Sequence, residues 1–380
     1  MSLKLFACGD VVNSKRNSKF IDTKLRDIIQ SCDIAICNFE APVEHSNMQK
    51  IKKAGPYLYQ SRESVKYLKD SGFNFVSLAN NHIYDYGQRG IEETICELQK
   101  TGIDFIGGGI NFDEAYKTKI IEKNGIKLGL LAGCENEFGC LYEEKNRGGY
   151  AWLLHPKIED NILYLKASCD FVVLVAHAGV ENIEIPIKEW RDIYKRFCDL
   201  GVNVIIGHHP HVPQGFEKYN GNLIFYSLGN FYFDSLYFNN QGDDSYSIVL
   251  SFEKKQNQKE INFEIVYHKK IKGQTSLVEK EDVNFDIDVL CNLLESNYQE
   301  KNNKLCIKLF YEYYLHYYEF ALDSFPRNST LLRKLKWLIK KLLPFDYKSN
   351  DRYLMLLHNI RIDSHRFLVQ RALSLLVEEE

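Results

Sequence analysis

Polar side chains of ligand type follow six short apolar runs in the first 230 residues of the sequence. Each run has the length and composition of a buried strand. The residues that follow these runs are Gly9-Asp10, Asn38-Phe39-Glu40, Asn80-Asn81-His82, His177, Gly207-His208-His209-Pro210-His211, and Ser227 with Asn230. Ligands of α/β sheets bind outside the carboxyl ends of the strands, so these side chains are expected to converge in one crevice.

One such residue alone is weak evidence, because a lone histidine after a strand is more often a hydrogen-bonded structural residue. Six groups together are hard to explain as packing, since apolar neighbours would leave several imidazoles and carboxylates unpaired. Two further carboxylates lie close in sequence: Asp85 is three residues after His82, and Glu181 is four residues after His177. The whole set therefore points to a functional site.

The chemical composition of the set favours a divalent metal such as Mn, Zn or Fe, because neutral imidazoles with carboxylate and amide oxygens suit these ions. A bound metal lowers the pKa of its water toward ~7 and holds the oxygens of a phosphate or carbonyl group. We expect one or two ions. The candidate ligands are Asp10, Glu40, Asn81, His177, His209 and His211, and Asn38 is a further possible donor.

His209-Pro210-His211 is the strongest pair of ligands. In an extended segment, residues i and i+2 point the same way, and the proline stiffens the loop that directs them. His82 is placed beside the ligand-type Asn81 to protonate a leaving group or to hold an oxyanion. We therefore assign catalytic roles to His82, Asp85 and Asn38.

Two competing motifs receive less support. Gly107-Gly108-Gly109 lacks the pattern of a phosphate-binding loop and is better explained as a tight turn before a helix at 112–116. The sequence has no Gly-x-Ser-x-Gly motif and no Cys/His nucleophile arrangement, so covalent hydrolase chemistry is disfavoured.

The elements that must position these residues alternate in type up to about residue 270, which is typical of an α/β domain. The predicted strands are 3–7, 34–37, 75–78, 105–106, 127–132, 171–176, 202–206 and 223–226. The predicted helices between them are 62–70, 90–100, 157–167 and 187–200. A β-hairpin is expected from 246–252 and 261–267.

The sequence after Lys280 carries helical periodicity and little strand signal, with helices expected at 289–294, 304–322, 330–343 and 354–377. We predict two domains, 1–275 and 276–380. In helix 330–343, leucine and isoleucine occupy one face and five basic residues the other. This pattern fits a membrane-surface helix or a docking face for an anionic partner. The explanation that we favour from sequence is a core-packing helix with a solvated basic back.

Composition narrows the class of protein. The chain has 380 residues, 45% hydrophobic and 26% charged, with a formal net charge of −3, which makes no case for a nucleic-acid partner. Its ten cysteines form no Cys-x-x-Cys pair, which fits reduced thiols of a cytoplasmic protein. We find no signal peptide and no apolar run long enough for a transmembrane helix.

Over residues 2–270 the sequence resembles the capsule-synthesis protein CapA family. The resemblance rests on the motifs above in their order, extended to Asn80-Asn81-His82-x-x-Asp85-x-Gly87, His177-x-Gly179-x-Glu181 and the run 226–231. That family is similar to the calcineurin-like metallophosphoesterases. The resemblance implies a four-layer α/β/β/α sandwich with a metal site at the strand ends, here followed by the helical C-terminal segment.

The resemblance also implies the same six metal-ligand positions, with His82 as the acid-like histidine. The sequence departs from the metallophosphoesterase pattern at Asp10-Val11-Val12, where Asp-x-His is expected, and at Asn38-x-Glu40, which replaces the second Gly-Asp. CapA-like proteins are associated with poly-γ-glutamate synthesis or export. The function expected is a metal-dependent hydrolase or transferase acting on an anionic polymer or a phosphorylated substrate. The alternative is a non-catalytic accessory subunit of a polymer-synthesis complex.

Overall fold

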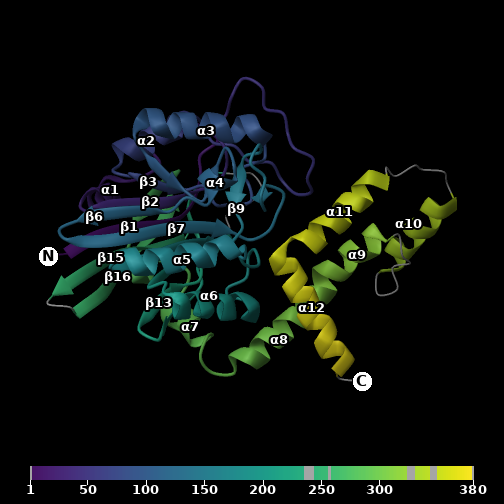
Figure 1. Ribbon diagram of the computed structural model, residues 1–380. Helices are drawn as coiled ribbons and strands as arrows, with labels where there is room; N and C mark the ends of the chain where they lie inside the picture. The colour runs from purple at the N-terminus through teal and green to yellow at the C-terminus, as the bar shows by residue number, and fades with distance from the viewer. Residues whose placement is uncertain (1, 235–243, 256–257, 323–329, 343–348, 379–380) are drawn as a thin grey trace. The chain divides into compact units, whose positions relative to one another are not determined.

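The computed structural model describes residues 2–234, 244–255, 258–322, 330–342 and 349–378 (Figure 1). The chain divides into two compact units: residues 1–51 with 56–296, and residues 52–55 with 297–380. Helix α7 (Ile287–Asn292) follows residue 275 in sequence but packs into the core of the larger unit, because Ile287 and Leu290 are buried there.

An eight-stranded mixed sheet forms the first half of the larger unit. Its order is β17-β16-β15-β1-β2-β3-β4, and β14 also pairs with β1. The bounds are β1 Ser2–Val12, β2 Ile34–Phe39, β3 Phe75–Ser77, β4 Asp104–Ile106, β14 Asn230–Phe233, β15 Asp244–Lys255, β16 Gln258–Ile271 and β17 Gln274–Leu277. Strands β1 to β4 are parallel, so their carboxyl ends lie at the same edge.

A six-stranded sheet forms the second half, in the order β12-β13-β11-β10-β7-β6. The bounds are β6 Lys119–Lys123, β7 Ile126–Cys134, β10 Phe171–His177, β11 Val204–His208, β12 Phe216–Tyr219 and β13 Asn222–Phe225. Strands β7, β10, β11 and β13 are parallel. A small third sheet joins β5 (Gly108–Gly109), β9 (Gly149–Ala151) and β8 (Cys140–Leu141).

The two large sheets pack face to face, and helices cover their outer faces (Figure 1). Ring contacts join the sheets: Phe171 lies 5.1 Å from Phe252 and Phe225 lies 5.2 Å from Phe263, measured between ring centroids. Helices α1 (Thr23–Gln30), α2 (Glu63–Asp70) and α3 (Gly87–Thr101) cover the first sheet, and α5 (Pro156–Ser168) and α6 (Lys188–Leu200) cover the second. This is the four-layer α/β/β/α sandwich that the sequence predicts.

The predicted strands and hairpin are confirmed within a few residues. In the hairpin, Tyr246 pairs with Tyr267 and Phe252 with Ile261. The glycine run after β4 lies partly in a strand, because Gly108 and Gly109 pair with β9 before the short helix α4 (Phe112–Ala115) begins. Half-buried strands show alternating apolar residues, and fully buried strands show continuous apolar runs. Both patterns are strong sequence signals for a strand, which explains this agreement.

The second unit is helical, as expected, but one of its helices is predicted wrongly. The chain forms α8 (Tyr298–Leu309), a π-helical turn (Phe310–Tyr314), α9 (Leu315–Ala321), α10 (Leu331–Leu342), α11 (Ser349–Arg361) and α12 (Asp363–Glu378). The single helix expected over 354–377 is therefore two. The break at Ile362 precedes Asp363 and Ser364, which are residue types that favour a helix start. Among the described residues, none of the helices is long and apolar enough to cross a bilayer.

One buried histidine in this scaffold makes stability depend on pH. His268 of β16 is 1% exposed, and its Nε2 lies 2.9 Å from the Ser247 hydroxyl. Burial lowers the pKa of His268 to about 3. The unfolded chain binds a proton near pH 6.5 while the folded chain does not, so stability is fully present above that pH and falls as the pH drops toward 3.

We predict that His268→Gln reduces the acid sensitivity of folding. When the pH is lowered from 7.5 to 5, His268 should reduce the unfolding free energy of the wild type by about 2 kcal/mol. The variant should not show this reduction. Urea unfolding at both pH values measures the difference. His155→Gln, a partly exposed histidine at the start of α5, serves as the control. An unchanged pH slope in His268→Gln would contradict the prediction.

Candidate metal centre

The predicted ligands lie together where the parallel strands of both sheets end. Asp10 belongs to β1, Glu40 follows β2 and Asn81 follows β3, while His177 ends β10 and His209 follows β11. Because β1, β2 and β3 are neighbours in one sheet and β7, β10 and β11 in the other, their ends meet. All six candidate ligands, His211 included, are at most 7% exposed.

Asp10 is placed by an irregularity in β1. The register with β2 shifts between Cys8 and Asp10, so Gly9 is an extra residue, and the strand continues to Val12 instead of ending before Asp10. A side chain at position 9 is not possible here, since its Cβ would lie 1.8 Å from the carbonyl oxygen of Gly229. Such bulges redirect the next side chain, here the carboxylate of Asp10.

The Asp10 carboxylate is surrounded by nitrogen atoms. Its Oδ1 accepts a hydrogen bond of 2.8 Å from Asn38 Nδ2 and lies 3.3 Å from His208 Nδ1, and its Oδ2 lies 3.4 Å from His211 Nδ1. Burial alone would raise the pKa of Asp10, but the two imidazoles outweigh it and hold that pKa well below its usual range. Asp10 is therefore ionised and available as a ligand.

Asn38 orders the centre of the cluster. Its Nδ2 donates to Asp10 and lies 3.1 Å from His177 Nδ1 and 3.4 Å from Glu40 Oε2. Its Oδ1 accepts a hydrogen bond of 3.2 Å from Asn80 Nδ2. The amide thus presents its nitrogen to the cluster and its oxygen to Asn80. An amide does not titrate at neutral pH, so this geometry suits a positioning role.

The environment of the Glu40 side chain indicates whether a cation fits the site. Its side chain is fully buried, and its Oε1 has no hydrogen-bond partner, with His211 Nε2 at 3.6 Å. Burial raises the pKa of Glu40 well above its usual range, and the nearby Asp10 carboxylate adds to the rise. A buried carboxylate oxygen without a donor is costly, and a bound cation removes the cost. The donor set therefore fits a metal ion.

His177 and His209 face each other across the same space. His177 Nε2 lies 3.0 Å from His209 Nδ1 and 3.2 Å from Asn81 Oδ1. Burial, together with the charge of neighbouring imidazoles, lowers the pKa of His177 well below its usual value, and burial lowers that of His209 to about 4. Both imidazoles are neutral near pH 7, which is the form that binds a metal.

The loop that carries His209 and His211 is not extended, so that sequence expectation is wrong. The φ angles of His209 and His211 are 97° and 59°, in the left-handed region that side chains rarely adopt. Strained backbone of this kind costs about 1–3 kcal/mol per residue and persists only where the surroundings enforce it. Here the bend still brings both rings to the cluster, by a different backbone path.

Two groups of donors are compact enough for metal ions. The potential ligand atoms of Asp10, Glu40 and His177 lie within 4.8 Å of one another, and so do those of Glu181, His209 and His211. The first group is fully buried, whereas Glu181 of the second is exposed. This arrangement accommodates the expected one or two divalent ions, with a buried position and a position open toward solvent.

His82 and Asp85 form a buried pair beside the ligand Asn81. His82 Nδ1 lies 2.7 Å from Asp85 Oδ2, which also accepts a hydrogen bond of 2.8 Å from the backbone of Leu58. The backbone N–H of His82 donates to Asn80 Oδ1 at 3.2 Å. The carboxylate therefore fixes the orientation of the imidazole, as a proton donor requires.

Sequence reasoning missed Glu135 at this site, and it named His208 and Asn230 among the strand-end residues without giving them a role. Glu135 Oε1 lies 3.6 Å from His209 Nε2 and accepts a hydrogen bond of 3.0 Å from Gly179 N. Asn230 Oδ1 lies 3.0 Å from His211 Nδ1. Glu135-Asn136-Glu137 follows β7 directly, so the strand-end signal that found the other residues was present for these as well.

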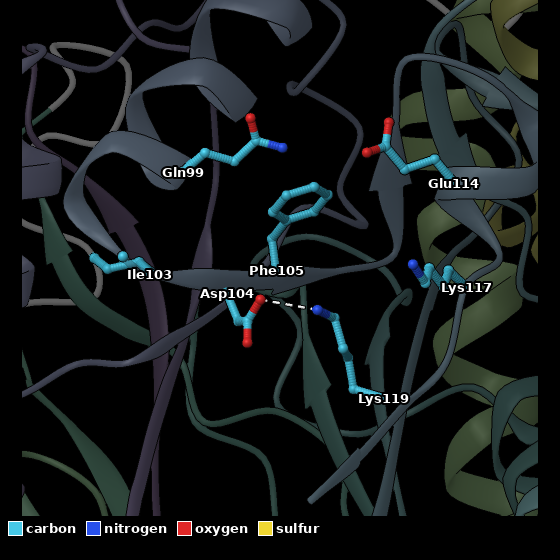
Figure 2. A pocket seen from close by; sticks show the side chains of 8 residues that line it. Gln99, Ile103, Asp104, Phe105, Glu114, Lys117 and Lys119 are labelled. Atoms are coloured by element: carbon cyan, nitrogen blue, oxygen red, sulfur yellow. Dashed lines mark hydrogen bonds and ion pairs between the residues drawn. The ribbon is translucent and has the colours of Figure 1, made fainter.

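A separate hollow of about 380 Å³ lies at the outer edge of the first sheet and contains none of these residues (Figure 2). Phe105 lies between Gln99 and Glu114, and Lys119 Nζ lies 2.8 Å from Asp104 Oδ1. Its charged side chains are paired or of mixed sign, so no ligand class is favoured there.

The chain is similar to known proteins over the region that carries these residues. The family model described as bacterial capsule synthesis protein PGA_cap matches residues 4–235. The PGA biosynthesis protein CapA of Bacillus subtilis is 34% identical over 235 residues, which are 60% of this chain and 62% of that protein. The capsule biosynthesis protein CapA of Bacillus anthracis is 32% identical over 232 residues, 59% of this chain and 56% of that protein.

The chain thus spans about three fifths of the length of the curated relatives it matches. Among solved structures, a 5'-nucleotidase precursor from Thermus thermophilus aligns with a TM-score of 0.44 and 11% identity, covering 79% of this chain and 59% of that one.

We predict that Glu40→Gln separates metal binding from folding. Wild-type protein stripped with a chelator should regain stability on addition of Mn²⁺ or Zn²⁺, by about 2.7 kcal/mol when free metal is a hundredfold above Kd. Glu40→Gln should weaken that response at least tenfold in metal concentration. The metal-free variant should be no less stable than the metal-free wild type, because a buried carboxylate is removed. Thermal unfolding with a metal titration measures both effects.

The matched control is Glu217→Gln. Glu217 pairs with Arg191 at 2.7 Å in a partly buried ion pair elsewhere in this unit. This change should lower metal-free stability and leave the metal response intact. A metal response in Glu40→Gln equal to that of the wild type would refute the assignment of Glu40.

Proposed function

The chain belongs to the bacterial capsule synthesis protein family, and on this premise we propose that it acts in the synthesis of a capsule polymer of the poly-γ-glutamate type. Its proposed activity is that of a metal-dependent hydrolase or transferase of the metallophosphoesterase kind. Its substrate is a phosphorylated compound or the anionic polymer itself.

The observation that carries this proposal is that the His82–Asp85 pair directly follows Asn81, whose Oδ1 lies 3.2 Å from His177 Nε2 in the metal-donor cluster. Divalent ions bound by these groups would hold substrate oxygens and supply hydroxide from water at neutral pH. An electrophile held there is adjacent to an oriented imidazole. A purely structural metal site does not require a separate proton-donor pair such as His82–Asp85.

The residues of the chain have distinct roles in such a reaction. His82 gives a proton from Nε2 to the leaving oxygen as its bond to phosphorus or carbon breaks and a bond to the attacking water oxygen forms. Asp85 keeps Nδ1 of the same ring engaged at 2.7 Å and stabilises the imidazolium before the transfer. Asn80 fixes the backbone of His82 and the side chain of Asn38, which joins the proton donor to the ligand cluster.

Electrostatics support the dependence on metal. The ionised Asp10 and the carboxyl groups of Glu135 and Glu181 lie around the same space, so an anionic substrate would be repelled from the metal-free site. Bound divalent ions would make the electrostatic potential of the site positive. Substrate binding is therefore coupled to metal binding in this proposal.

A second candidate, a non-catalytic accessory subunit, is favoured by one observation. Val12 stands where metallophosphoesterases have a histidine, and it packs with Ala41, Leu58 and Phe233 in a small apolar cluster. One donor of the usual dinuclear site is thus absent from that position. In this case the metal would order the loops for polymer or partner binding.

We predict that His82→Gln lowers turnover by 10²–10⁴-fold while retaining bound metal, because it removes the proton donor and leaves every proposed ligand in place. Release of p-nitrophenol from p-nitrophenyl phosphate, and shortening of γ-linked glutamate oligomers, measure turnover with Mn²⁺ or Zn²⁺. Elemental analysis of the same samples measures the metal.

The chain offers a matched control in His316→Gln. His316 and Glu319 form another histidine–carboxylate pair three residues apart, at 3.3 Å, on helix α9. That variant should keep full activity. If the metal-loaded wild type turns over neither substrate, the accessory role replaces the enzymatic one.

A further inference from the structure

Helix α10 (Leu331–Leu342) turns an apolar face to solvent. Its exposed apolar residues are Leu331, Leu332, Leu335, Leu338 and Ile339, with exposed fractions of 75%, 63%, 46%, 46% and 51%. At about 100° per residue, these positions occupy one arc of roughly 120° around the helix. Trp337 is on the opposite side of the helix and is less exposed. The leucine face of the helix is therefore exposed to solvent in the described part of the chain.

This exposure argues against the simplest explanation of the pattern, a core helix with a solvated basic back. A core helix would bury its leucines, as α12 does with Leu368 and Val369 in the same unit. Among the described elements, none packs extensively along α10, whereas α11 packs against both α9 and α12. The leucine face remains available for an external surface.

The polar face of α10 has a single sign of charge. The helix sequence contains five basic residues and no acidic residue, and Lys334 and Lys336 are the basic residues whose side chains the structure describes. Of the placed side chains, Lys336 is exposed and Lys334 partly so. A surface that complements such a helix must have an apolar interior and must carry negative charge where it meets water.

We propose that α10 binds the surface of an anionic lipid bilayer, lying in the plane of the headgroups. The leucine face would enter the acyl boundary, while the basic residues would contact the negative headgroups. A soluble polyanion complements only the charges and would leave the five apolar side chains in water. The bilayer is therefore the occupant that the combination of both faces favours.

Co-sedimentation of the full chain with vesicles tests this proposal. The vesicles are phosphatidylcholine alone and phosphatidylcholine with 30% phosphatidylglycerol, at 0.1 M and 0.5 M salt. We expect binding to the anionic vesicles at 0.1 M salt, at least tenfold weaker on the neutral vesicles and weakened by 0.5 M salt. Absence of binding of the wild type, or equal binding to both vesicles, would overturn the proposal.

Two double variants separate the contributions. Leu335→Asp with Leu338→Asp, and Lys334→Glu with Lys336→Glu, should each reduce binding at least tenfold. The controls are Leu163→Asp, which changes a leucine 49% exposed on α5, and Lys145→Glu with Lys157→Glu, which changes two exposed lysines. Both controls should bind as the wild type does. Circular dichroism checks that every variant is folded.

Two outcomes would assign α10 to another partner and overturn the lipid proposal. One is binding to soluble poly-γ-glutamate that the lysine variant abolishes and the leucine variant preserves, with no vesicle binding. The other is a wild-type dimer in light scattering that the leucine variant dissociates, again with no vesicle binding.

Discussion

The burial of two carboxylates, Asp10 and Glu40, at the meeting point of the two sheets is the constraint on which the site depends. Asp10 is ionised because nitrogen atoms surround it, whereas Glu40 has a buried oxygen with no donor. A buried ionised carboxylate and a buried carboxyl oxygen without a donor are both costly unless they are paired or bound to a cation. The surrounding asparagine and histidine side chains lie within contact distance of these two carboxyl groups, which explains why so many polar side chains are buried here.

The sheet topology explains how residues from distant parts of the chain satisfy that constraint. Parallel strands end at one edge, so each strand delivers one donor to the same place without a long loop. The bulge at Gly9 then turns Asp10 toward the second sheet, and the left-handed backbone at His209 and His211 turns their rings toward the first. Strain in that loop is offset by contacts of the His211 ring with Asp10, Glu40 and Asn230, and of the His209 ring with His177 and Glu135.

Sequence alone predicts the scaffold and most of the cluster, because both depend on local patterns. Apolar runs on buried strands are visible in one dimension, and so are the ligand-type residues that end them. The roles within the cluster are not visible in this way: Asn38 looks like any other donor until its nitrogen is seen to face Asp10 and its oxygen Asn80. The bend at His209 depends on tertiary contacts, and Glu135 went unnoticed although it follows β7 directly. In the helical unit, continuous apolar periodicity conceals the break before Asp363.

The two units depart from ordinary packing in opposite ways: one buries polar side chains and the other exposes apolar ones. The larger unit buries charged and polar side chains and offsets them with one another, which is the expected cost of a chemical site held on rigid strands. The helical unit exposes leucine and isoleucine on α10, where a soluble helix would bury them. Each departure from ordinary packing is locally unfavourable, and each becomes favourable when an external component is added. For Asp10 and Glu40 that component is a cation, and for the leucine face it is a surface that excludes water.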